Sequence, residues 1–153
     1  MSLATQPGKG TAVITGASTG IGAVYASRLA RMGYDLIIIA RNHNLLNQMA
    51  SHITADTARN VEVVATDLGD AQQLAALEKK LRADASITLL VNNAGVGTHT
   101  PLLSSDVDQM QAMINLNVVA LTRLTYSMVP GFVARGVGAI INISSIVSLA
   151  PEL

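Results

Sequence analysis

The stretch Thr15-Gly16-Ala17-Ser18-Thr19-Gly20-Ile21-Gly22 decides the fold of this chain. It follows a short apolar run over residues 11–15 (TAVIT) and precedes residues 21–31, whose apolar side chains recur at helical spacing. A strand that ends in glycines and leads directly into a helix opens a β-α-β unit. The sequence therefore predicts a strand over 11–15 and a helix over 21–31.

The same alternation of apolar runs and amphipathic segments continues along the chain. Further strands are expected over residues 36–40, 61–65, 87–91 and 138–144. Residues 36–40 (LIIIA) are apolar at every position, which is typical of a strand covered on both faces. Strands that alternate with helices predict parallel crossovers. The predicted fold class is α/β, a Rossmann-like doubly wound parallel sheet with about five strands. It is incomplete, with residues 1–10 as a tail and 11–153 as a partial domain.

Helices are expected between these strands. One covers residues 45–53, and another follows Asp70 as its N-cap, with Gln73 three residues later. Ser105-x-x-Asp108 resembles a capping box at the start of a long helix, which Pro130 should bend or end. The expected apolar face of this long helix is formed by Val107, Met110, Ile114, Val118, Leu121 and Leu124.

Composition excludes several classes of protein. The 153 residues carry 10 basic and 10 acidic side chains, so the formal net charge is zero, which argues against a nucleic-acid module. The chain has no cysteine, which excludes disulfides and zinc–thiolate sites and is compatible with a reducing cytosol. No apolar run reaches the length that spans a bilayer, and residues 1–10 lack the apolar core of a signal peptide. We expect a cytoplasmic protein with no metal site, no nucleic-acid partner and no membrane partner.

The glycine turn has a chemical interpretation. Gly16 permits a tight turn, Gly20 lets the backbone approach a pyrophosphate, and Gly22 allows close packing of helix and sheet. The N-terminus of the helix offers unpaired N–H groups to phosphates. Ser18 and Thr19 add hydroxyl donors. The alternative is an ordinary glycine-rich turn between a strand and a helix.

Three motifs in order resemble the short-chain dehydrogenase/reductase family. They are the Gly-x-x-x-Gly-x-Gly turn, Asn92-Asn93-Ala94-Gly95 after the fourth expected strand, and Asn142-Ile143-Ser144-Ser145 after the fifth. The resemblance covers the chain from Thr11 onward. It implies a nicotinamide dinucleotide bound across the strand ends. It also implies hydride transfer between this cofactor and a small carbonyl or alcohol substrate.

The resemblance also bears on the choice of cofactor. NAD-preferring members usually end the second strand with an acidic residue, whereas this chain has Ala40 followed by Arg41. A guanidinium here suits the 2′-phosphate of NADP, so NADP is favoured over NAD. The alternative is a solvated surface arginine. Thr19 departs from the pattern, because many NADP-preferring members carry a basic residue there.

Further cofactor residues follow from the resemblance. Asp67 matches the aspartate that accepts from the adenine amino group, with Leu68 contributing backbone; a turn cap is an alternative, and both roles can hold together. Asn93 matches the position near the cofactor ribose, whereas for Asn92 we prefer a structural tie between strand ends. The predicted cofactor-binding residues are Gly16, Ser18, Thr19, Gly20, Ile21, Gly22, Arg41, Asp67, Leu68, Asn93, Ala94 and Gly95.

The implied catalytic residues are Asn117 and Ser145. Asn115 competes with the first and Ser144 with the second. In the family, the asparagine holds a water, and the serine hydrogen-bonds the substrate oxygen. The family's general acid is a tyrosine in a Tyr-x-x-x-Lys motif, which these 153 residues do not contain.

We therefore expect the N-terminal, cofactor-binding part of a short-chain oxidoreductase, inactive as 153 residues alone. At full length, it is expected to form a homo-oligomer through its long helix. The principal alternative is a non-catalytic nucleotide-binding fragment. A Rossmann-like methyltransferase is disfavoured by the motifs at Asn92 and Ser144.

Overall fold

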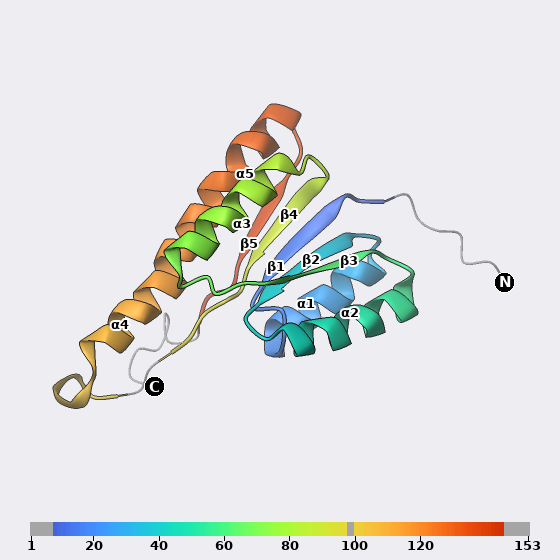
Figure 1. Cartoon of the computed structure of the whole chain (residues 1–153). Coiled ribbons are helices and arrows are strands. Elements are labelled where there is room, and N and C mark those ends of the chain that lie inside the picture. The colour runs from blue at the N-terminus through green and yellow to red at the C-terminus, as the bar shows by residue number, and fades with distance from the viewer. Residues whose placement is uncertain (1–7, 98–99, 146–153) are drawn as a thin grey trace.

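Five strands alternate with helices along the chain (Figure 1). The computed structural model describes residues 8–97 and 100–145. The strands are β1 (Thr11–Thr15), β2 (Asp35–Ala40), β3 (Val61–Ala65), β4 (Ile87–Asn92) and β5 (Ala139–Asn142). The α-helices are α1 (Gly20–Arg31), α2 (His43–Thr57), α3 (Ala71–Ala83), α4 (Val107–Ile114) and α5 (Leu121–Arg135). A 3-10 turn, η1 (Leu102–Ser104), precedes α4, and a π-helix, η2 (Asn115–Ala120), joins α4 to α5.

The strands form one sheet in the order β3-β2-β1-β4-β5, and every neighbouring pair is parallel. The order reverses direction between β1 and β4, so the crevice beyond their carboxyl ends is the expected ligand position in an open α/β sheet. The predicted fold class, a Rossmann-like doubly wound parallel sheet, is confirmed.

Helices cover both faces of the sheet. Helices α1 and α2 lie on one face, and α3 and α5 lie on the other (Figure 1). Strand β2 serves both cores, because Leu36 and Ile38 pack toward α1 and α2, while Ile37 and Ile39 pack toward α3 and α5. This double burial explains why the run is apolar at every position.

An ion pair joins the two helices on the second face. Arg123 of α5 donates from Nη2 to Oε2 of Glu78 in α3 at 3.0 Å, and its Nε also donates to the same carboxylate. Glu78 is buried, whereas the Arg123 side chain is about half exposed. Hydrogen bonding to Glu78, together with its charge, raises the pKa of Arg123. The pair therefore fixes α3 against α5.

The helix after η1 begins at a different cap from the predicted one. Ser105 is not its cap: its Oγ donates to the Leu102 carbonyl at 2.9 Å, while Oδ1 of Asp106 accepts from the Asp108 N–H. Pro130 does not end α5, which continues to Arg135. Proline has no backbone N–H, so one hydrogen bond of the helix is missing. The loss of this hydrogen bond is tolerated because Pro130 lies on the solvent-exposed side of α5.

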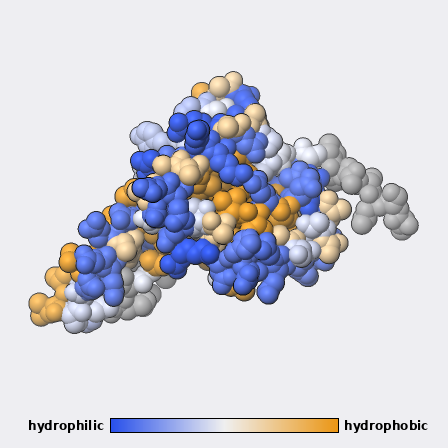
Figure 2. Space-filling view, viewed as in Figure 1, coloured by the Kyte–Doolittle hydropathy of each residue, from blue (hydrophilic) through white to orange (hydrophobic). Residues whose placement is uncertain are grey.

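The expected apolar face of this helix is buried over only part of its length. Leu124 is buried, but Val107, Ile114 and Val118 are 76%, 50% and 55% exposed. Helix α4 projects beyond the sheet, so its side chains have no sheet to contact (Figure 1). The π-helix η2 has more residues per turn than an α-helix, so it changes which side of the helix the following residues face. Figure 2 shows apolar surface at this projecting end, which carries the exposed Leu102 and Leu103.

Candidate cofactor-binding site

The glycines of the turn after β1 have two different physical roles. Gly16 has φ +65°, and a Cβ on it would lie 2.8 Å from Ala94 Cα and 2.8 Å from Asn93 Nδ2. Gly22 is buried, and a Cβ there would meet the Gly16 carbonyl. Gly20 has φ +57° but open space around its missing Cβ. Gly16 and Gly22 thus permit close packing, and Gly20 permits the backbone conformation.

Helix α1 begins without a side-chain cap. Its N-cap, Thr19, makes no capping hydrogen bond, whereas the side chains of Asn42, Asp70 and Asp106 cap α2, α3 and α4. The first amides of a helix have no partner within the helix. At α1 the N-cap side chain does not supply one, and such a helix start suits an anionic ligand at the positive end of the helix dipole.

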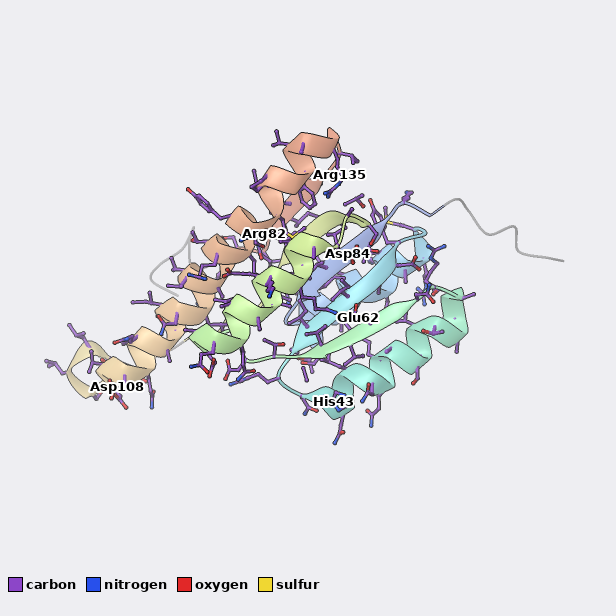
Figure 3. The ribbon with its side chains drawn as sticks, turned by 45° about the horizontal axis from the view of Figure 1, so that its top comes forward. His43, Glu62, Arg82, Asp84, Asp108 and Arg135 are labelled. Atoms are coloured by element: carbon purple, nitrogen blue, oxygen red, sulfur yellow. The ribbon has the colours of Figure 1, made fainter. Side chains whose placement is uncertain are left out.

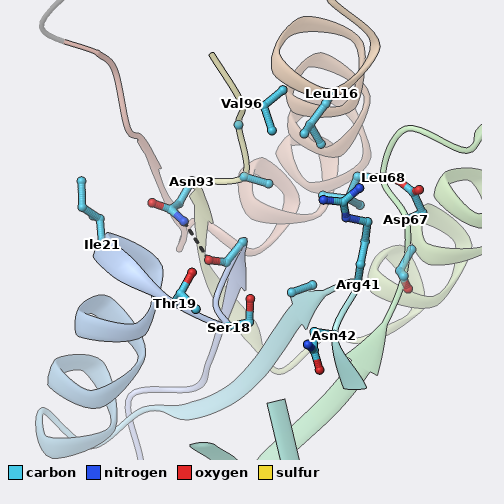
Figure 4. A pocket seen from close by; sticks show the side chains of 15 residues that line it. Ser18, Thr19, Ile21, Arg41, Asn42, Asp67, Leu68, Asn93, Val96 and Leu116 are labelled. Carbon is cyan, nitrogen blue, oxygen red and sulfur yellow. Dashed lines mark hydrogen bonds between the residues drawn. The ribbon is translucent and has the colours of Figure 1, made fainter. Parts of the chain in front are cut away.

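A cleft of about 410 Å³ opens at the carboxyl ends of β1 to β4 (Figure 4). Every predicted cofactor residue lines it except Gly20 and Gly22. Sequence reasoning missed five further lining residues, namely Ala40, Asn42, Thr66, Val96 and Leu116. Leu116 comes from η2, distant in sequence, and no motif indicates it.

Thr15 ties the end of β1 to the end of β4. Its Oγ1 accepts from the backbone N–H groups of Asn93 and Ala94, both at 3.0 Å. In return, Nδ2 of Asn93 donates to the carbonyls of Thr15 and Gly16 at 2.9 and 3.1 Å. Asn93 therefore holds the glycine turn in place. The role of Thr15 was missed, although a hydroxyl that directly follows the apolar residues 12–14 of a buried strand signals a need for polar partners.

Asn92 links β4 to its neighbours. Its Nδ2 donates to Asn142 Oδ1 in β5 at 3.0 Å and to Thr125 Oγ1 in α5 at 3.2 Å. The predicted structural tie between strand ends is confirmed. Because Asn142 ends β5, this tie also fixes the start of the segment that leads to Ser145.

The end of β2 presents a cation and no carboxylate. Arg41 is exposed, lines the cleft, and lies across from the turn that follows β3 (Figure 4). Within residues 8–97 and 100–145, no ion pair to Arg41 is found. Asn42 follows and caps α2 by accepting from the Leu45 N–H at 3.1 Å. An anionic group at this position would meet one available guanidinium.

The turn after β3 is built by two aspartates. Oδ1 of Asp67 accepts from the Gly69 N–H at 2.9 Å, so the turn role proposed as an alternative is present. Oδ1 of Asp70 accepts from the N–H groups of Gln72 and Gln73 at 2.8 and 2.9 Å, as an N-cap should. The backbone N–H of Gln73 is the main cause that lowers the pKa of Asp70.

The predicted catalytic residues lie at the same edge of the sheet. Asn117, in η2, bonds the backbone of Val96, which lines the cleft. Asn115 lines a neighbouring hollow instead. Ser145 and Ser144 follow β5, and both are exposed. Ser145 does not line the cleft, so the structure does not bring the two predicted catalytic residues together there.

Comparison with known proteins identifies the chain. A family model described as short chain dehydrogenase matches residues 10–153. The chain belongs to the short-chain dehydrogenase family. The short-chain dehydrogenase motifs described above are therefore in their proper structural context. None of the helices within residues 8–97 and 100–145 has the length and apolar character needed to cross a bilayer.

Individual relatives agree with this assignment. The chain is 33% identical to a very-long-chain 3-oxoacyl-CoA reductase from Anas platyrhynchos over 97% of its own length and 49% of the relative. A short-chain dehydrogenase from Sphingobium yanoikuyae in complex with NADPH shares 43% identity at a TM-score of 0.91, covering 94% of this chain and 56% of that one. A bulky-bulky ketone specific alcohol dehydrogenase from Comamonas testosteroni shares 39% identity at a TM-score of 0.92, covering 95% and 59%. The chain spans about half the length of the curated relatives it matches.

Proposed function

We propose that this chain is the cofactor-binding part of a short-chain oxidoreductase that transfers hydride between NADP(H) and a small carbonyl or alcohol substrate. The observation that carries the proposal is the uncapped start of α1 beside the glycine turn, in a cleft lined by Arg41. The helix start suits a pyrophosphate. The guanidinium, with Ala40 in place of an acidic residue, suits a 2′-phosphate.

The comparisons support the choice of NADP. The Sphingobium yanoikuyae relative is in complex with NADPH. In this chain, the charge-assisted hydrogen bond from Arg41 would be worth about 1.5–3 kcal/mol, or about tenfold to a hundredfold in affinity. The dinucleotide supplies the hydride when bound. Ser145 would hold the substrate oxygen, and Asn117 would fix the loop at Val96 that forms one wall of the cleft.

Binding measurements test the choice of cofactor. We expect the purified protein to bind NADPH at least about tenfold more tightly than NADH in a calorimetric titration. Arg41→Ala should remove this preference by weakening NADPH alone. Arg82→Ala is the matched control, because Arg82 is an exposed arginine in the last turn of α3 (Figure 3). Equal binding of the two dinucleotides by the wild type would contradict the proposal.

A non-catalytic nucleotide-binding protein is the second candidate. It is favoured by the position of Ser145, which does not line the cleft that holds the predicted cofactor residues. The two candidates differ in turnover: with a panel of ketones, an oxidoreductase consumes NADPH, and Ser145→Ala abolishes consumption without changing NADPH affinity. NADPH binding with no turnover in the longest natural form of the protein would favour the second candidate.

Assembly into a homo-oligomer is also proposed. Val107, Ile114, Val118 and Val133 leave apolar side chains of α4, η2 and α5 in water, and such surfaces are typical of interaction sites. Sedimentation at several protein concentrations measures the assembly.

A further inference from the structure

The chain that leaves β3 keeps one hydrogen bond to β2 after both strands have ended at the cleft. The N–H of Thr66 donates to the Ala40 carbonyl at 3.0 Å, just past the last paired residues, Ala40 and Ala65. Beyond this point β2 has ended, and its chain turns into α2 through Arg41. Successive amides along a strand point to opposite sides, and β3 is an edge strand of the sheet. The next amide, that of Asp67, therefore faces a side with no neighbouring strand among the described residues, and its acceptor must come from elsewhere.

Gln73 supplies that acceptor. Its side-chain Oε1 accepts from the Asp67 N–H at 3.0 Å. In an ordinary capping box, the side chain three residues after the N-cap reaches back to the N–H of the N-cap itself. Here the N–H of the N-cap, Asp70, donates instead to the Asp67 carbonyl at 3.2 Å. Both backbone polar groups of Asp67 are thus held by the start of α3.

The side chain of Asp67 is held at the same time. Its Oδ1 accepts from the Gly69 N–H at 2.9 Å, and the residue lines the cofactor cleft (Figure 4). Gln73 does not line the cleft. Gln73 therefore acts on a ligand only indirectly, and Asp67, whose main chain it holds, is the cleft residue that it contacts.

We propose that Gln73 is a positioning residue for recognition of the adenine 6-amino group. By holding the Asp67 N–H where the sheet ends, it keeps the Asp67 carboxylate directed at an amino group in the cleft. The inference rests on the proposed function, in which Asp67 accepts from adenine. It adds a residue that contacts no part of the dinucleotide and yet sets its base selectivity.

The experiment compares NADPH with its 6-deamino analogue, in which hypoxanthine replaces adenine and a carbonyl replaces the amino group. We expect the wild type to prefer NADPH by about tenfold, because the analogue offers no amino donor to the carboxylate. Asp67→Ala should abolish this preference. Gln73→Leu should reduce it toward the Asp67→Ala value, and Gln73→Glu, which keeps an acceptor, should retain it.

Gln72→Leu is the matched control. Gln72 lies in the same first turn, is exposed, and contributes its backbone N–H to the Asp70 cap. It should keep the wild-type preference. The ratio of two affinities on one variant is insensitive to loss of folded protein, because unfolding weakens both ligands equally.

Two results would overturn the proposal while leaving NADP binding intact. One is a Gln73→Leu variant that retains the full preference or weakens both dinucleotides by the same factor. The other is a wild type that binds both with equal affinity. A wild type that binds neither dinucleotide would overturn the proposed function as well.

Discussion

The side-chain amide of Asn117 and the backbone of Val96 form a closed pair of hydrogen bonds. Oδ1 of Asn117 accepts from the Val96 N–H at 3.0 Å, and Nδ2 donates to the Val96 carbonyl at 2.8 Å. The Asn117 side chain, from the π-helix η2, thereby makes the two backbone hydrogen bonds at Val96 that a neighbouring strand would make inside a sheet. Val96 lines the cleft, so the pair positions one of its walls.

Asn117→Ala should remove both hydrogen bonds that hold the Val96 backbone at the cleft. Two net hydrogen bonds are worth about 1–3 kcal/mol, and alanine returns about 0.5 kcal/mol through its better helix propensity. We therefore expect the free energy of unfolding in urea to fall by about 0.5–2.5 kcal/mol. Asn115→Ala is the control, because it gains the same propensity and does not bond Val96. Equal effects of the two substitutions would contradict the role of the pair.

Gly16→Ala and Gly20→Ala should differ in their cost. Both positions have positive φ, so both variants pay about 1–2 kcal/mol of backbone strain. Only at Gly16 would the new Cβ also lie 2.8 Å from Ala94 Cα, where backbone must move. Gly16→Ala should therefore be the more destabilising, by about 1–3 kcal/mol in equilibrium unfolding. The prediction fails if Gly20→Ala is the more destabilising of the two.

Breaking the Arg123–Glu78 pair should destabilise the chain more than breaking an exposed pair. Arg123→Met leaves the buried Glu78 carboxylate without its partner, which costs more than the contact itself. Lys80→Met is the comparison, since Lys80 and Glu62 are each 47% exposed and such pairs contribute less than about 1 kcal/mol. The urea midpoints of the two variants measure the difference. Equal midpoints would show that the buried pair does not stabilise the contact between α3 and α5.

The cap at Asp70 should make stability dependent on acidity. Its pKa is lowered on folding below the ordinary 3.8, chiefly by the Gln73 N–H. A carboxyl group with a lowered pKa stabilises the fold fully above the ordinary value and loses that contribution as the pH falls through the folded value. Asp70→Asn keeps an acceptor but cannot titrate, so its stability should vary less between pH 5 and 2. Identical pH profiles for wild type and variant would contradict the assignment.

Sequence patterns predicted the elements whose causes are local. The glycine turn, the first four apolar strands and the Asp70 cap appear within one residue of where they were expected, because each depends on residues a few positions apart. The fifth strand was expected over residues 138–144 and is shorter, Ala139–Asn142. Even the tie from Asn92 to the neighbouring strand could be anticipated, since a buried amide at a strand end requires a partner.

The parts that could not be predicted depend on contacts distant in sequence. The π turn at η2 leaves no mark in the apolar spacing, yet it places Asn117 against Val96 and Leu116 in the cleft. The hydroxyl of Thr15 signals a need for polar partners, but the sequence does not show that these partners are the Asn93 and Ala94 amides beyond β4. Pro130 was expected to bend or end its helix; it does not end it, because Pro130 lies on an exposed face and α5 continues to Arg135.

Because α1 has no side-chain cap, a bound dinucleotide would also stabilise the folded chain, apart from any part in hydride transfer. A good N-cap contributes about 1 kcal/mol to a helix. Helices α2, α3 and α4 each have a side-chain N-cap, and α1 has none. A ligand that completes this first turn binds only the folded chain. By mass action, at a hundred times its Kd it adds about 2.7 kcal/mol of stability. The fraction of folded chains in a cell would then follow the size of the dinucleotide pool.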